Sequence, residues 1–218
     1  MYLPAQFAET RPEVLHALIA THALGTIVTL TADGLTANHI PFELDPRTSE
    51  TAPHGTLQAH VARANRLWQD FSRDVDALVI FQGPQTYITP NWYVDTKPRN
   101  GQVVPTWNYC VVHARGPLIV HDDPVWLRGQ LDRLVRRHES TQPKPWSVAD
   151  APRDFIEKQI AAIVGIEIPI RHIEGKWKVS QNRSEPDRAG VIAGLRAANS
   201  AEADAMARLV EERRSRSS

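Results

Sequence analysis

The stretch that decides the fold and the site runs from Tyr87 to Gly116, YITPNWYVDTKPRNGQVVPTWNYCVVHARG. It places Trp92, Tyr93, Trp107 and Tyr109 beside asparagines, threonines and basic residues. Ordinary core strands alternate apolar and polar residues and do not gather amides beside indoles. A buried amide costs free energy unless it is hydrogen-bonded. The stretch therefore favours a site for a planar, polar-edged, anionic ligand. The alternative, that the tryptophans fill a barrel core, stays open.

A second polar cluster, KWKVSQNR at residues 176–183, repeats this composition near the end of the chain. Lys178, Gln181 and Arg183 offer donors to an anion or a ring edge. The simpler reading is a polar turn that precedes a helix. If both clusters bind one ligand, the site is assembled from distant parts of the sequence.

Hydrophobic periodicity around these clusters predicts several short strands with helices between and after them. The predicted strands cover residues 26–30, 35–44, 56–60, 76–83, 107–121 and 161–180, the last broken at Pro169 and turned at Glu174-Gly175. The predicted helices begin near Thr10, near residue 62 and after Asp123, and cover 153–159, 185–198 and 201–214. Residues 90–105 hold three prolines and a glycine, and are predicted to form a long loop. The pattern favours a mainly β fold with peripheral helices (α+β), built as a small antiparallel barrel.

The totals limit the class of protein. At 218 residues we expect one domain over residues 1–183 and a C-terminal helical extension over residues 184–218. Lys plus Arg equals Asp plus Glu, at 25 each, which argues against broad electrostatic binding of nucleic acid. The single cysteine, Cys110, fits a reducing compartment. Without a secretion signal or an apolar run of about 18 residues, a cytoplasmic protein with no membrane partner is expected.

Catalytic and metal motifs find little support. There is no G-x-S-x-G elbow, no Walker loop and no G-x-G-x-x-G after a strand. Cys110 lies in an apolar strand pattern and is expected to pack in the core. The nine histidines show no metal-ligand spacing, so no metal site is predicted. His39 and His60, each on a predicted strand near a polar cluster, are equally open to a functional and a structural role.

A phosphate group could meet Arg63, Asn65 and Lys97, whose donors suit anionic oxygens. The alternative is that Arg63 and Arg66 form only the solvated face of a short helix.

Several motifs in order resemble one family. MYLPAQF, HIPFEL, HVARAN, FQGPQTYITPNWY, VPTWNYCVVHARG and KVSQNR resemble PaiB-type proteins, the FMN-binding negative transcriptional regulators. The resemblance extends from Met1 to about Leu195. It implies an FMN-binding split β-barrel, related to pyridoxamine-phosphate oxidases, that forms a homodimer with FMN at each of two interface sites.

The resemblance also implies which residues bind the cofactor. His39, Ile40 and Pro41 would lie along the flavin ring, and His60, Arg63 and Asn65 would approach its ribityl-phosphate end. Thr89 retains the hydroxyl of a family serine. Trp107, Asn108 and Tyr109 would lie at the interface, near the flavin of the other subunit. Lys178, Gln181 and Arg183 would complete the pocket from that same partner.

The function implied first is an FMN-binding transcriptional regulator, acting on DNA directly or through a protein partner. No helix-turn-helix with a basic recognition helix is evident, and the only strong basic cluster is the tail at residues 208–218. An alternative is a flavin-dependent oxidoreductase, of the reductase or oxidase type, in which His60, Tyr109 and Lys178 transfer protons or orient a small substrate. A third is a haem- or ligand-binding sensor, with His60 or His172 as an iron ligand.

Overall fold

The computed structural model describes residues 1–215, and within them the chain forms two compact units. Unit 1 contains residues 1–18 and 82–112 and the described residues from 174 onward. Unit 2 contains residues 19–81 and 113–173. The chain therefore passes between the units several times, and the residues of each unit come from distant parts of the sequence.

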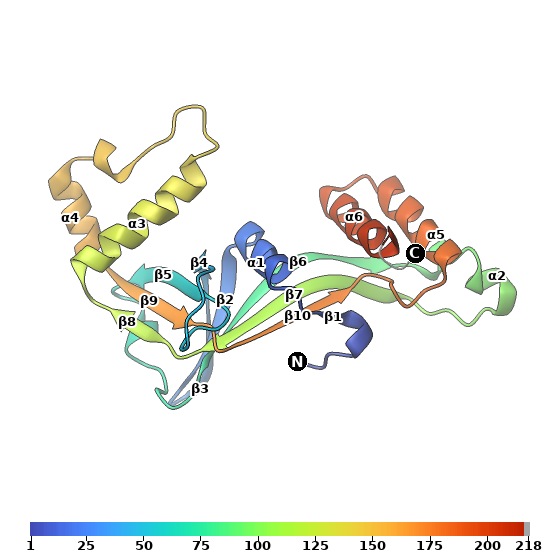
Figure 1. Cartoon of the computed structure of the whole chain (residues 1–218), viewed down its shortest axis with the longest axis horizontal. Coiled ribbons are helices and arrows are strands. Elements are labelled where there is room, and N and C mark those ends of the chain that lie inside the picture. The colour runs from blue at the N-terminus through green and yellow to red at the C-terminus, as the bar shows by residue number, and fades with distance from the viewer. Residues whose placement is uncertain (216–218) are drawn as a thin grey trace. The chain divides into compact units, whose positions relative to one another are not determined.

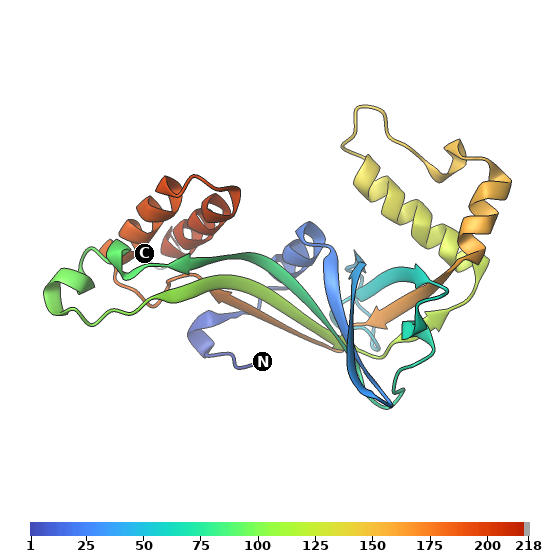
Figure 2. The ribbon, with the colours of Figure 1, turned by 180° about the vertical axis from the view of Figure 1, so that it is seen from behind.

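The strands and helices are labelled in Figure 1 and seen from behind in Figure 2. The strands are β1 Ala8–Glu9, β2 Leu24–Thr31, β3 Gly34–Pro41, β4 Glu43–Asp45, β5 Thr56–Ala62, β6 Ala77–Ile88, β7 Thr106–Gly116, β8 Ile119–His121, β9 Ile163–Pro169 and β10 His172–Lys178. The α-helices are α1 Pro12–Thr21, α2 Thr96–Asn100, α3 Pro124–Glu139, α4 Arg153–Ala161, α5 Glu185–Ala197 and α6 Ala201–Ser215. Short 3-10 turns are η1 Ala5–Phe7, η2 Arg66–Trp68, η3 Pro90–Trp92 and η4 Val148–Asp150.

Two antiparallel sheets carry the fold. One has the strand order β1-β10-β7-β6-β2-β3 and the other the order β4-β5-β9-β8. The mixed α+β class predicted from the sequence is confirmed. A turn at Ala32-Asp33 joins β2 to β3, with Thr31 paired to Gly34.

The core of unit 1 lies between its strands and its helices. Val191 and Leu195 of α5 and Met206 and Val210 of α6 are fully buried, and the two helices lie side by side (Figure 1). Cys110 is also fully buried, as predicted, and burial raises the pKa of its thiol. A neutral, buried thiol packs as a small hydrophobe and is a poor nucleophile.

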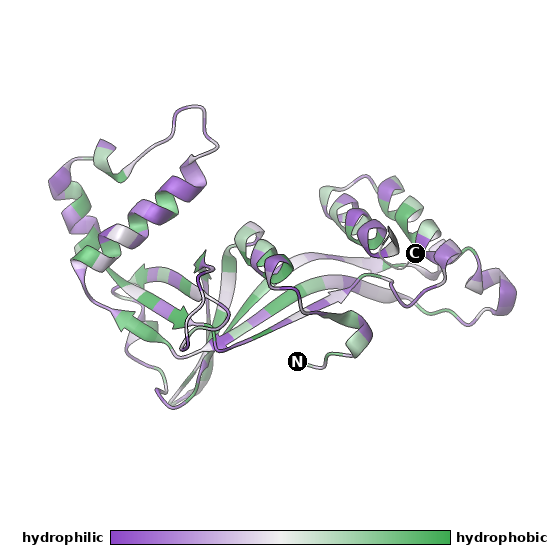
Figure 3. Ribbon diagram, viewed as in Figure 1, coloured by the Kyte–Doolittle hydropathy of each residue, from purple (hydrophilic) through white to green (hydrophobic). Residues whose placement is uncertain are grey.

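In unit 2, the four-stranded sheet has one apolar face and one polar face. Leu57, Ala59 and Val61 alternate with Gln58 and His60 along β5. Figure 3 shows bands of hydrophobic and hydrophilic residues along this strand. The helices α3 and α4 have a small apolar cluster of their own, formed by Leu127, Val148, Ile156 and Ile160. Asp123 accepts a hydrogen bond from Val125 N at 3.0 Å, so the predicted cap of α3 is confirmed.

Two predicted strand boundaries are wrong. β6 does not end at Gly83-Pro84 but continues to Ile88. Its register with β2 covers only Leu78 to Ile80, so no N–H at Pro84 is needed by that neighbour. Gly175 does not turn the chain but lies inside β10, where a Cβ would collide with the side chain of Leu15. The turn falls earlier, between β9 and β10.

Two predicted local structures also differ. Residues 62–65 do not begin a helix, because β5 extends to Ala62 and the 3-10 turn begins only at Arg66, after an Asn65 cap. The stretch 90–105 is not a structureless loop, since it holds η3 and α2. Pro90 and Pro98 lie in first turns, where a missing N–H is tolerated.

Candidate functional site

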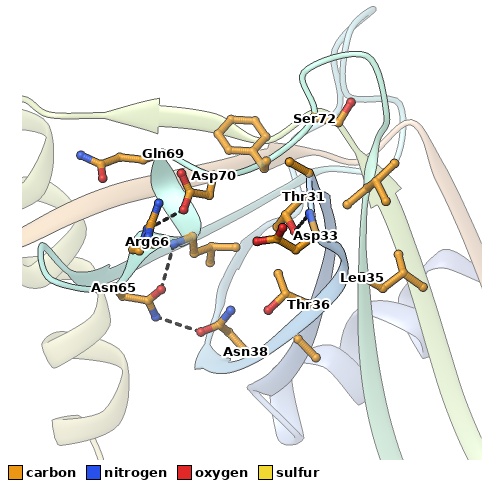
Figure 4. Close-up of a pocket in the computed structure, with 15 residues that line it drawn as sticks. Thr31, Asp33, Leu35, Thr36, Asn38, Asn65, Arg66, Gln69, Asp70 and Ser72 are labelled. Atoms are coloured by element: carbon orange, nitrogen blue, oxygen red, sulfur yellow. Dashed lines mark hydrogen bonds and ion pairs between the residues drawn. The ribbon is translucent and has the colours of Figure 1, made fainter.

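A groove of about 940 Å³ lies in unit 2, along β3 and the segment that follows β5 (Figure 4). Its volume falls within the range of about 300–1,000 Å³ that is usual for small-molecule sites. Its lining is mostly polar, with apolar contributions from leucines and Phe71. The lining residues are Leu30, Thr31, Ala32, Asp33, Leu35, Thr36, Ala37, Asn38, Asn65, Arg66, Leu67, Gln69, Asp70, Phe71 and Ser72.

Asn65 joins the two walls of this groove. Its Nδ2 donates to Asn38 Oδ1 at 2.9 Å, and its Oδ1 accepts from Leu67 N at 2.9 Å (Figure 4). The second bond caps η2, which explains why an asparagine follows β5 at this point. The structure thus places Asn65, a predicted cofactor residue, in a pocket.

The groove does not carry a net positive charge. Arg66 forms an ion pair with Asp70 at 2.5 Å, and Asp33 adds a second carboxylate. Its amides and hydroxyls can hydrogen-bond a polar ring edge or a polyol chain. A dianionic phosphate, in contrast, finds only one guanidinium here, already paired with a carboxylate.

The predicted residues of β3 lie directly after Asn38. His39 and Pro41 are exposed, whereas Ile40 is buried. A strand presents successive side chains to opposite faces, so His39 and Pro41 share one face.

Arg63 is engaged by neighbours in its own unit. Its Nη1 and Nη2 donate to the two oxygens of Asp122 at 2.9 and 2.5 Å. Its Nε donates to Ala161 O at 2.9 Å, and Nη2 also reaches Ile163 O at 3.1 Å. Asp122 neutralises the guanidinium, so Arg63 adds no net positive charge to this region.

His60 points to α3. Its Nδ1 lies 2.9 Å from Oε1 of Gln130, a residue with no exposed surface. Nearby, Trp126 stacks on His121 with ring centroids 4.2 Å apart and covers Gly165, where a Cβ would collide with the indole. His60 therefore helps to seat α3 on the polar face of the sheet.

In unit 1, aromatic side chains follow β6 and β7. Trp107 is 47% exposed and Tyr87 49% exposed, and their rings meet edge to face at 6.2 Å. The indole of Trp107 donates to Gln85 Oε1 at 2.5 Å. Asn108, by contrast, is buried and its Nδ2 donates to Ser180 Oγ at 2.9 Å. The predicted PTWNY motif thus exposes the ring of Trp107 while its amide is held inside.

Basic residues of β10 and of the segment after it lie beside this aromatic surface. Lys178 Nζ donates to Thr106 Oγ1 at 2.5 Å and to Trp107 O at 2.8 Å. Lys176 lies 5.3 Å from the Tyr109 ring centroid, and the guanidinium carbon of Arg183 lies 4.4 Å from that of Tyr93. Burial lowers the pKa of Lys178, and the charges of Lys176 and Arg183 lower it further.

Gln181 has a structural role within this chain. Its Oε1 accepts from Val179 N at 2.8 Å, and its Nε2 donates to Gln6 O and Trp177 O at 3.0 and 2.5 Å. These bonds tie the N-terminal segment to the end of β10. Both ends of its amide are engaged by the backbone.

The stretch between β6 and β7 is attached to α5. Asp187, with no exposed surface, accepts from Asp95 N at 2.8 Å, Thr96 N at 3.2 Å and Thr96 Oγ1 at 2.5 Å. Trp92 packs where side chains at Gly190 and Gly194 would collide with it. Thr89 caps η3 by accepting from Asn91 N at 3.2 Å. This stretch, predicted as a loop, is therefore held by α5 of its own chain.

The predicted site residues therefore divide between the units. His39, Ile40, Pro41, His60, Arg63 and Asn65 belong to unit 2, whereas Thr89, Trp107, Asn108, Tyr109, Lys178, Gln181 and Arg183 belong to unit 1. Sequence reasoning missed Asn38 and Lys176. Two signals were available: Asn38 directly precedes the HIP motif, and Lys176 lies two residues before Lys178, on the same face of a strand.

Within residues 1–215, no three or more His, Cys, Asp or Glu side chains are placed to hold a metal ion. In the same part of the chain, every helix is too short or too polar to span a membrane.

Comparison with known proteins gives a family and a fold. The family model described as "Putative FMN-binding domain" matches residues 1–172. An uncharacterized protein of Emericella nidulans is 34% identical over 244 residues, covering 98% of this chain and 97% of the relative. The Bacillus subtilis "Protease synthase and sporulation protein PAI 2" is 30% identical over 215 residues, covering 98% of each chain.

Solved structures share the fold at low identity. A conserved protein of Mycobacterium tuberculosis has a TM-score of 0.57 and 12% identity, covering 85% of this chain and 95% of that chain. The "FAD and Heme binding protein" of Mycobacterium smegmatis has a TM-score of 0.54 and 18% identity, covering 78% of this chain and 73% of that chain. These likenesses establish the split-barrel fold that the sequence predicted.

Proposed function

This chain belongs to the FMN-binding domain family, and we propose that it is a homodimeric FMN-binding protein that acts as a negative regulator of transcription. The observation that carries the flavin-binding part is the groove of unit 2, with amides and hydroxyls around a space of about 940 Å³. The regulatory part is supported by the full-length similarity to the Bacillus subtilis PAI 2 protein.

The residues present fit FMN. Asn38, Asn65 and Gln69 supply amide groups for the edge of a ring or for a ribityl chain, and Leu35 supplies an exposed apolar surface. His39 and Pro41 follow along the same strand. When bound, FMN supplies redox chemistry, while these side chains hold and orient it.

A second copy of the chain would complete the pocket. Trp107 and Tyr87 leave about half of their surface exposed on the sheet of unit 1. Large apolar rings exposed side by side are typical of protein interfaces. We therefore assign Trp107, Tyr109, Lys178 and Arg183 of the second copy to the outer wall of the flavin pocket.

Visible absorption tests the cofactor. The purified protein is mixed with FMN, freed of excess by gel filtration and scanned, with its mass measured by light scattering. A dimer that retains the flavin spectrum is expected. A blank spectrum at saturating FMN would overturn the proposal.

The regulatory role has a separate test. Because the chain has no net formal charge, strong non-specific binding to DNA is not expected. Promoter fragments taken from the protein's own genome should be bound selectively, with weak dependence on salt, or only in the presence of a protein partner. If neither the isolated protein nor a cell extract containing it protects any promoter, the regulatory assignment fails.

A flavin-dependent oxidoreductase is the second candidate, favoured by the lowered pKa of Lys178 beside an aromatic surface. A lysine that titrates closer to neutrality can take part in proton transfer. Oxidation of NADH or NADPH by the FMN-loaded dimer, abolished in Lys178→Met at full flavin occupancy, would favour this candidate over the regulator.

A further inference from the structure

Three basic side chains of unit 1, Lys176, Lys178 and Arg183, lie on β10 and in the segment that follows it. Lys176 Nζ donates to the backbone oxygen of Tyr2 at 3.0 Å, and Lys178 contacts a hydroxyl and a carbonyl. Arg183 lies over the ring of Tyr93. Within residues 1–215, none of the three forms an ion pair with Asp or Glu. Glu174, two residues before Lys176, is paired with the N-terminal ammonium at 3.1 Å.

Several basic residues elsewhere in residues 1–215 do pair with carboxylates. Other basic residues with partners of opposite charge include Arg11 with Glu9, Arg63 with Asp122 and Arg66 with Asp70. Lys176 is only 8% exposed, so its ammonium has lost most of its contact with water. A buried charge is costly unless it is paired, and contact with aromatic rings offsets only part of that cost.

The three charges act on one another. Lys176 and Lys178 are two residues apart on β10, so their side chains leave the strand on the same face. The lowered pKa of Lys178 reflects first its burial and then the nearby charges of Lys176 and Arg183. Like charges held together repel, and an anion placed among them would relieve that repulsion.

The region around Arg63, which the sequence predicts to bind phosphate, has no excess of positive charge. Arg63 has Asp122 on both terminal nitrogens, and the groove has two carboxylates against one guanidinium. A dianionic phosphate would meet neutral or negative surroundings there. Lys176, Lys178 and Arg183 together offer the positive charge that it needs.

We propose that Lys176, Lys178 and Arg183 form the site that binds the phosphate group of a small-molecule ligand, in place of Arg63. The inference deepens the proposed function and rests on it for the identity of the ligand. The phosphate belongs either to FMN or to a phosphorylated second ligand, and these share the chemistry of a phosphate monoester.

Inorganic phosphate is the first probe. Titration calorimetry on the flavin-free, full-length dimer compares wild type with Lys176→Met and Lys178→Met, and with Lys158→Met, an exposed lysine of α4, as the control. Loss of a charged hydrogen bond predicts affinity about tenfold or more weaker for the first two variants and unchanged for the control. Lys176→Arg, which keeps the charge, should restore binding if Lys176→Met folds poorly.

FMN and riboflavin then identify the source of the phosphate. If the phosphate is that of FMN, Lys176→Met and Lys178→Met bind FMN no better than riboflavin. If the phosphate belongs to a second ligand, Lys176→Met and Lys178→Met keep their affinity for FMN. Their FMN-loaded forms then lose affinity for inorganic phosphate. The proposal is overturned if both variants bind phosphate and FMN like wild type, or if Arg63→Met alone loses them.

The two failures are distinguishable. A wild-type protein that binds inorganic phosphate through this cluster but takes up no FMN sinks the proposed function and leaves the phosphate site standing. A protein that retains FMN with unchanged affinity in every variant, and whose variants bind phosphate like wild type, keeps the function and loses the site.

Discussion

The groove of unit 2 and the basic cluster of unit 1 use the same residue types for different purposes. In the groove, Arg66 is matched by Asp70, and the polar surface is left with amides and hydroxyls that favour a neutral, hydrogen-bonding ligand. In the cluster, Lys176, Lys178 and Arg183 contact carbonyl, hydroxyl and aromatic groups, so their charge remains available. The comparison teaches that the partner of a basic residue, rather than the residue, decides whether it supports the fold or attracts an anion.

The largest effect is expected where residues 95–96 are attached to α5. Asp187→Ala removes a buried carboxylate and leaves the N–H groups of Asp95 and Thr96 and the Thr96 hydroxyl without their acceptor. The free energy of unfolding should fall by about 3 kcal/mol, measured by urea denaturation. Thr96→Val, which removes one of these bonds, should cost less. Equal stability of Asp187→Ala and wild type would show that the attachment of residues 89–101 to α5 does not support unit 1.

The same carboxylate gives a dependence on pH. Burial alone would raise the pKa of Asp187, but the hydrogen bonds from Thr96, Asp95 and Ser184 outweigh it, and the pKa lies below its usual value. Its contribution to stability is therefore complete above the ordinary carboxyl pKa of about 3.9 and is lost as the pH falls through the lower, folded value. Unfolding midpoints of wild type and Asp187→Asn, measured from pH 7 to pH 3, should converge toward the acid end.

An effect of intermediate size distinguishes the basic cluster of unit 1 from the groove of unit 2 by its charge. Because the pKa of Lys178 is lowered, its positive charge disappears at a lower pH than that of an ordinary lysine. Binding of inorganic phosphate should weaken by up to about tenfold, or about 1.4 kcal/mol, as the pH rises toward alkaline values. Lys178→Arg should flatten the decline, since arginine keeps its charge. A profile that is unchanged in this variant would remove Lys178 from the cluster.

A smaller effect is expected in the groove. Asn65→Ala removes the cap of η2 and the bond to Asn38, at a cost of about 1 kcal/mol in stability. Asn65→Asp keeps the cap acceptor but removes the donor to Asn38, so it separates the two contributions. If the groove holds the cofactor, Asn65→Ala should also weaken the binding of riboflavin and of FMN equally, because neither hydrogen bond of Asn65 concerns the phosphate. Selective loss of FMN would place the phosphate here instead.

The smallest effect is expected when the ion pair of Arg63 in unit 2 is removed. Arg63→Met removes an ion pair between two largely exposed side chains, a kind of contact that contributes little in water. Phosphate and FMN binding should stay at wild-type values, as measured by calorimetry and by flavin fluorescence. A marked loss of FMN affinity would return the phosphate to the HVARAN segment.

Much of the fold could be read from local sequence signals. Asp123 predicted the start of α3, because a capping side chain acts on backbone groups only a few residues away. Gly175 was misread as a turn, since only the packed side chain of Leu15 shows that a strand glycine is needed there. The basic tail predicted at residues 208–218 is only partly described: Arg213 contacts Glu9, and residues 216–218 lie outside the described part.

The sequence by itself determined the family, the mixed α+β fold and the two polar clusters, because each rests on residue types at short spacing. Only the tertiary structure decided which polar groups are engaged. Asp122, 59 residues after Arg63, neutralises it, while Glu174, two residues before Lys176, is paired with the chain's own N-terminus. Charge compensation depends on neighbours brought together by folding, and no spacing in the chain records it.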